Sequence, residues 1–120
     1  MGNATFVEVL PTSYNFGNSD VANGVVVSTN FTVKNIAPTG GTRYIGIAFA
    51  VSGANANDFT ARSTDCANAL PPGGICTVTV DFKAGAVGSR IGVLDVSAHE
   101  PGMANISLGL DKAGLSGNGI

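Results

Sequence analysis

Apolar and polar residues alternate along several short stretches of the chain. This pattern is typical of β-strands that cover a core with one face, because successive side chains of a strand point to opposite sides. The clearest stretches span residues 25–34 and 76–83. Their apolar positions, which we expect to face the core, are Val25, Val27, Phe31, Val33, Cys76, Val78, Val80 and Phe82. In residues 45–51, large apolar residues alternate with glycine and alanine, so the second face is available for another part of the structure to cover.

Further strands are predicted at Thr5–Leu10, Tyr14–Phe16, Asp58–Ala61, Arg90–Ala98 and Ala104–Leu110. Turn-forming residues rich in Asn, Pro and Gly separate these stretches. Seven or eight short strands at regular spacing, each with one apolar face, predict an all-β sandwich of two sheets. The chain has no internal repeat, low-complexity segment or linker, and we therefore expect residues 1–120 to form a single domain.

The composition agrees with an all-β chain, because its 13 Val, 7 Ile and 10 Thr are residues that favour strands. Only 12% of residues are charged and 44% are hydrophobic, which excludes a disordered chain. Six Lys and Arg residues are too few for the basic surface that phosphate contacts need, so we expect no nucleic-acid partner. No apolar run approaches the roughly 18 residues of a membrane-spanning helix, so no transmembrane segment is expected.

The chain has two cysteines, Cys66 and Cys76, on either side of a segment with a double proline and a double glycine. A disulfide between them would close a short loop, worth roughly 3 kcal/mol in the chain-entropy model. The alternatives are a metal site and a reactive thiol. Zinc needs four ligands, and the only histidine, His99, is far away in the sequence. A disulfide is the favoured prediction and would place the chain in an oxidising compartment.

Several short motifs occur in an order that is similar to a known family. Their positions are Pro11–Gly17 (P-x-x-x-x-F-G), Phe31–Asn35 (hydrophobic-x-V-x-N), Cys66 followed by Leu70–Phe82 (C…L-x-P-G-x-x-C-x-V-x-V-x-F), Gly88–Val96 (G-x-x-x-x-x-L-x-I) and Leu115–Gly119 (L-S-G-x-G). Together they resemble Hydin-type (ASH) immunoglobulin-like domains, whose bacterial versions are often called choice-of-anchor D domains. Two departures are Lys83–Ala86, where the family usually has a T-P step, and a long segment at 99–112.

The resemblance implies an immunoglobulin-like sandwich of seven to eight strands, usually a module of a larger surface or scaffold protein without catalytic activity. We therefore expect a non-catalytic structural or protein-interaction module of an extracellular or cell-surface protein, with the periplasm as a further location. Its partner would be a protein, either an adjacent domain or an identical subunit joined through edge strands or sheet faces. The alternative is a carbohydrate- or other ligand-binding module, which the absence of Trp and the presence of only two Tyr disfavour.

Candidate interaction residues are apolar side chains at strand positions that alternate away from the core. Leu94 and Val96 match the family's core positions, which leaves Ile91 and Val93 on the opposite face of their strand. A second group, predicted to form an edge strand open to pairing, is Ile106, Leu108 and Leu110. His99 is expected to be a solvent-exposed turn residue. The acidic residues are scattered singly, so we predict no catalytic residue, no metal site and no cofactor.

Overall fold

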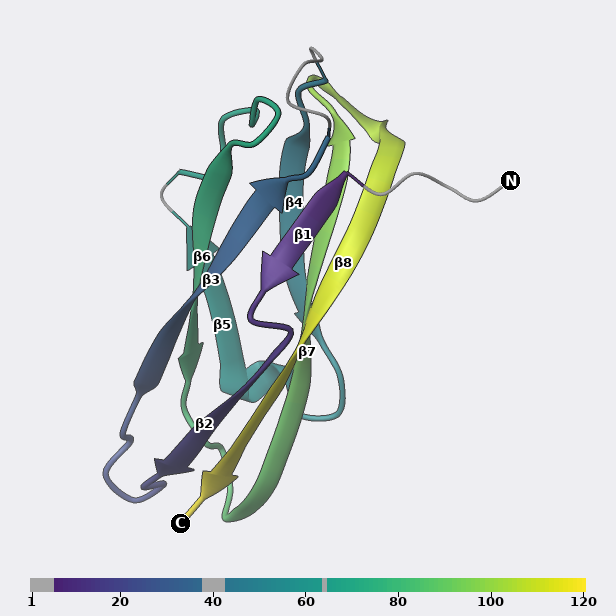
Figure 1. Cartoon of the computed structure of the whole chain (residues 1–120). Helices are drawn as coiled ribbons and strands as arrows, with labels where there is room; N and C mark the ends of the chain where they lie inside the picture. Colours follow the sequence, from purple (N-terminus) through teal and green to yellow (C-terminus); the bar gives the residue numbers. More distant parts are fainter. Residues whose placement is uncertain (1–5, 38–42, 64) are drawn as a thin grey trace.

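The two sheets of the sandwich pack face to face in a computed structural model that describes residues 6–37, 43–63 and 65–120 (Figure 1). One sheet has the strand order β1-β3-β6-β5 and the other β2-β8-β7-β4. The strands are β1 (Val7–Leu10), β2 (Ser13–Ser19), β3 (Val27–Asn35), β4 (Gly46–Ser52), β5 (Phe59–Ser63), β6 (Ile75–Phe82), β7 (Gly88–Glu100) and β8 (Met103–Gly119). The predicted all-β, immunoglobulin-like sandwich is confirmed, because this strand order is that of immunoglobulin domains.

The last two strands form a long hairpin that runs the full height of the second sheet (Figure 1). β8 continues for 17 residues, from the predicted strand at 104–110 through the closing motif at 115–119. Its second half pairs with β7 on one side and, in parallel, with β2 on the other. A single short 3₁₀ helix, η1 (Ala56–Asp58), interrupts the strands of the described residues between β4 and β5.

The core forms where the alternating residues of the two sheets meet. All four inward positions of β6, Cys76, Val78, Val80 and Phe82, are fully buried, as predicted. Three aromatic rings gather at one end of this core: Phe59 and Phe82 stack with centroids 4.9 Å apart, and Phe16 lies 5.6 Å and 5.7 Å from them. Such aromatic pairs add stability beyond their buried area.

The prediction that Val25 faces the core is wrong, because this side chain is 41% exposed. The turn after β2 has not yet ended at Val25, whose N–H still donates to the carbonyl of Asp20. β3 begins two residues later, at Val27, and its alternation then follows the prediction, with Phe31 and Val33 buried.

The predicted disulfide between Cys66 and Cys76 is present, with the two Cα atoms 5.2 Å apart. It ties the loop after β5 to the beginning of β6. Asp65 strengthens the same attachment, since its carboxylate accepts a hydrogen bond of 3.0 Å from the N–H of Thr77. Both cysteines are buried.

Gly117 on β8 provides a test of how tightly the two sheets pack. A methyl group at this position would lie 2.4 Å from Cε2 of the buried Phe82 ring. We expect Gly117→Ala to lower the free energy of unfolding by about 1–3 kcal/mol, because the ring must move within a filled core. Gly114→Ala on the same strand is the control, since its methyl group would meet only Cβ of Ser13, at 3.5 Å. Equal urea midpoints for the two variants would contradict this packing.

Candidate protein-interaction surface

The outer face of the β1-β3-β6-β5 sheet is polar in its middle, where side chains bind one another, while Ile75 is exposed at one end of β6. Ser28 Oγ donates to Asp81 at 2.5 Å, and Arg62 forms an ion pair of 3.0 Å with the same carboxylate. One row further along the sheet, Thr79 Oγ1 donates to Asn30 at 2.8 Å. These hydrogen bonds within the face leave it without an apolar patch in its middle.

The outer face of the β2-β8-β7-β4 sheet has a different character, and we call its central part the small-residue face. It consists of Ala48, Ala50 and Ser52 from β4, Ile91, Val93, Asp95 and Ser97 from β7, and Leu110, Lys112, Gly114 and Ser116 from β8. Most of these side chains are Gly, Ala or Ser, so the sheet backbone lies close to the surface. Asp95 and Lys112 form its one charged pair, at 3.7 Å.

Three of the five residues predicted as an interaction surface lie on the small-residue face. Ile91 is 51% exposed, and Val93 beside it on β7 is half-buried. Leu110, opposite Ser97 at the other end of the face, is 55% exposed. The alanines of β4 are also exposed. The outer face of β4, which carries these alanines, is therefore not covered by any described part of the chain.

The three residues predicted to form an edge strand, Ile106, Leu108 and Leu110, do not share one face of β8. The register shifts between the pairs Ala98↔Gly109 and His99↔Ser107, so β8 has an extra residue at Leu108. Such a bulge reverses the alternation of side chains. Leu108 therefore packs against the core, whereas Leu110 is exposed. Ile106 is 40% exposed near the end of the hairpin.

The short helix η1 fixes the end of β7 that presents Ile91. The N–H of Ile91 donates to Oδ1 of Asn55 at 2.9 Å, and the N–H of Asn55 donates to the carbonyl of Ile91 at 2.9 Å. Three residues later, Asp58 accepts hydrogen bonds from Nε of Arg90 at 2.6 Å and from the N–H of Gly85 at 3.0 Å. These contacts hold Ile91 in place without covering its side chain.

The Asp58 carboxylate is only 8% exposed, and burial alone would raise its pKa. The hydrogen bonds from Arg90 and Gly85 outweigh this effect, and the pKa of Asp58 lies below its usual value. The pKa of Asp81 is lowered as well, by hydrogen bonds from Arg62 and Ser28. General acids at neutral pH need the opposite shift, so these two carboxylates have the properties of structural ion-pair partners.

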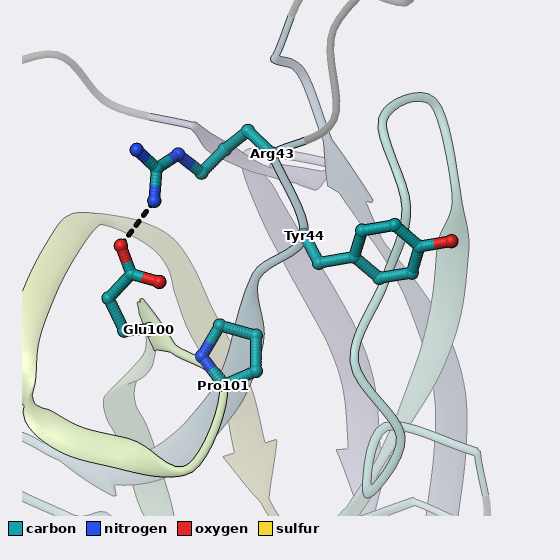
Figure 2. Close-up of a pocket in the computed structure, with 4 residues that line it drawn as sticks. All are labelled: Arg43, Tyr44, Glu100 and Pro101. Carbon is teal, nitrogen blue, oxygen red and sulfur yellow. Dashed lines mark hydrogen bonds and ion pairs between the residues drawn. The ribbon is translucent and has the colours of Figure 1, made fainter.

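A hollow of about 580 Å³ lies at the end of the sandwich where the β7–β8 turn meets the segment before β4 (Figure 2). It is lined by Arg43, Tyr44, Glu100 and Pro101. Arg43 and Glu100 form an ion pair, and the guanidinium also lies 6.0 Å from the centre of the Phe6 ring. The ring of Tyr44 points away from this ion pair (Figure 2). The sequence carries no signal for the contact between Arg43 and Glu100, because the two residues meet only in the folded chain.

His99 is not the exposed turn residue that the sequence predicted. It lies within β7, half-buried, opposite Gly46 of β4. A side chain at Gly46 would collide with the imidazole, since a Cβ atom there would lie 2.3 Å from its Cε1. Among the described residues, the group of potential metal ligands is Asp65, Cys66 and Cys76, and both sulfurs of this group are joined in the disulfide.

Comparison with known proteins identifies the fold. No family model and no curated protein matches the chain. Among solved structures, the ASH/PapD-like domain of human CEP192 (PapD-like domain 7) is 20% identical over 98% of this chain and 87% of that one, with a TM-score of 0.67. A Porphyromonas gingivalis protein of unknown function is 13% identical over 97% of this chain, with a TM-score of 0.66.

This chain spans only 47% of the Porphyromonas gingivalis chain. A third similar structure is SSP-19, an MSP-domain-like protein of Caenorhabditis elegans, which is 18% identical over 92% of this chain and 97% of that one, with a TM-score of 0.58. These likenesses show the fold, an immunoglobulin-like sandwich of two sheets. In the described residues, no helix is long and apolar enough to cross a membrane.

Acid should weaken the support that Asp58 provides. Its pKa is lower in the folded than in the unfolded chain, where it is near 4, so its stabilisation is present above that value and is lost as the pH falls below it. We expect Asp58→Asn to cost about 2–3 kcal/mol at pH 7. The variant should also lose less stability than the wild type between pH 7 and pH 3, as measured by urea unfolding.

Asp81→Asn is the matched control, because its partner Arg62 is 59% exposed and surface ion pairs contribute less than about 1 kcal/mol. A cost for Asp81→Asn as large as that for Asp58→Asn would contradict the structural role of the Asp58–Arg90 pair.

Proposed function

We propose that this domain is a non-catalytic protein-interaction module that contacts its partner through the small-residue face. The observation that supports this most is the contrast between the two outer faces. The middle of one face is filled by polar side chains that bind one another, whereas the other face consists mainly of glycine, alanine and serine, with Ile91 and Leu110, each more than half exposed, toward its two ends. Small side chains let a partner approach the sheet backbone closely, and a partner that spans the face would cover the exposed apolar residues at both of its ends.

The fold supports a modular role. Its neighbour in human CEP192 is a numbered PapD-like domain of that protein, and the Porphyromonas gingivalis chain is about twice as long as the segment matched here. The partner in this proposal is a protein, either an adjacent domain or an identical subunit. A carbohydrate ligand is less well supported, because the exposed ring of Tyr44 points away from the polar groups of the hollow (Figure 2).

The disulfide supports an extracellular or cell-surface location, with the periplasm as a further possibility within the same proposal. Disulfides persist in oxidising compartments and are rare in the cytosol, where thiols are kept reduced. The Cys66–Cys76 bond closes a loop whose ends are separated by 10 residues, and both of its sulfurs are buried. It is a structural bond in a small domain.

Site-specific photocrosslinking tests the proposed interaction surface. A photoreactive benzoylphenylalanine replaces Ile91 or Leu110 in the cells that produce the protein, and covalent adducts are identified by mass spectrometry. We expect both positions to trap the same protein, because both side chains lie on the small-residue face.

The control position is Ile75, which is 59% exposed on the outer face of the other sheet. Failure of both Ile91 and Leu110 to form adducts, or an equal yield of the same adduct from Ile75, would contradict the proposal.

The proposed location is tested by the redox state of the cysteines. Protein taken from its producing cells under alkylating conditions should show no free thiol by mass. Cys66→Ser combined with Cys76→Ser should lower the free energy of unfolding by about 3 kcal/mol, and the reduced wild type should match it. Two alkylated cysteines in freshly isolated protein would contradict an extracellular location.

A further inference from the structure

β4 is an edge strand without the usual protection against pairing with another chain. Among the described strands it pairs only with β7, and its register there is unbroken from Gly46 to Ser52 (Figure 1). Its seven residues, GIAFAVS, include no charged residue and no proline. Charged side chains, prolines and bulges are the features that normally prevent edge strands from associating.

The free edge of β4 has a row of unpaired backbone groups. Ile45, just before the strand, uses its N–H and C=O on Leu70, at 3.0 Å and 2.8 Å, on the side away from β7. Backbone groups of successive residues point alternately to the two sides of a strand. Those of Ile47, Phe49 and Val51 therefore face the same side as Ile45, where no other described strand pairs with them.

The other edges of the sandwich are protected. β5 has only five residues, and its exposed Arg62 forms an ion pair with Asp81. The pairing of β2 is broken by a register shift between Asn15 and Asn18. β1 is the other edge strand of its sheet, and β8 covers its free side. The N–H of Val9 donates to the carboxylate of Asp111 at 2.9 Å, and the N–H of Phe6 donates to the carbonyl of Leu108 at 3.1 Å.

The sequence of β4 is nearly symmetric about its central residue. If two copies of the strand run antiparallel with Phe49 opposite Phe49, then Ile47 lies opposite Val51 and Ala48 lies opposite Ala50. Aliphatic residues thus meet aliphatic residues on the inner side, and alanines meet alanines on the small-residue face. The outward backbone groups of this register would form about six hydrogen bonds between the copies.

We infer that β4 joins a second copy of this chain, strand to strand and antiparallel about Phe49, so that the two β2-β8-β7-β4 sheets become one continuous sheet. A second copy is the fitting occupant because the strand is complementary to itself and bears no charge that self-pairing would bring into repulsion. The side chains of Ile47, Phe49 and Val51 pack against the core while remaining partly exposed, and the added strand would cover them. This inference goes beyond the proposed function, since it names a partner and an edge distinct from the small-residue face.

Charge placement at two exposed positions tests the pairing and its register. In Ala48→Lys with Ala50→Lys, each lysine would lie opposite a lysine of the other copy, about 5 Å away at Cβ, at two symmetric places. We expect the dimer dissociation constant, measured by sedimentation equilibrium, to rise at least about tenfold. Ala48→Lys with Ala50→Glu places opposite charges together in the same register and should retain the dimer. An equimolar mixture of the double-lysine and double-glutamate variants should form mixed dimers.

The matched control is Asn30→Lys with Thr32→Lys, two exposed positions of the inner strand β3 that should leave the dimer unchanged. A wild-type chain that stays monomeric at the highest soluble concentration would overturn the inference. Equal weakening by the control pair, or failure of the Lys/Glu variant to dimerise, would do so as well. Crosslinking at Ile91 is measured separately, so a monomeric wild type that still forms adducts at Ile91 would refute β4 pairing and leave the proposed function intact.

Discussion

The contact between Phe82 and Gly117 determines how closely the two sheets can approach. Phe82 is the last residue of β6, and its ring fills the space that the missing side chain of Gly117 leaves on β8. The same ring stacks on Phe59 and packs against Phe16, so four strands from both sheets meet at this point. The remaining core consists mainly of valine, isoleucine and leucine, which fill the rest of the interior by ordinary alternation.

Alternation was a reliable guide wherever a strand has one buried face. β6 follows it without exception, and β3 follows it from Val27 onward. The prediction was wrong at Val25 because a turn hydrogen bond to Asp20 delays the strand, and a pattern of residue types contains no information on that bond. It was wrong at Leu108 because one extra residue in β8 changes the phase, and a bulge of this kind depends on the partner strand.

Alternation also made part of the candidate site predictable. Ile91 and Val93 could be identified as residues out of phase with the core, and both lie on the outer side of β7. The lack of large side chains around them depends on which strands become neighbours, and sheet order is not encoded in local alternation. The position of His99 over Gly46 and the ion pair between Arg43 and Glu100 likewise arise from pairing between distant segments.

The bulge in β8 divides the long hairpin into two parts, and the residues that face inward in one part do not determine which residues face inward in the other. Below it, every second residue of β8 is committed to the interior, from Ala113 to Gly119. Above it, the register with β7 shifts a second time, between His99 and Glu100. A change of sequence or length in this upper part can therefore be absorbed at the bulge without exchanging the buried and exposed faces of the lower part. The tip of the hairpin can thus change in sequence or length while the sandwich beneath it keeps its architecture.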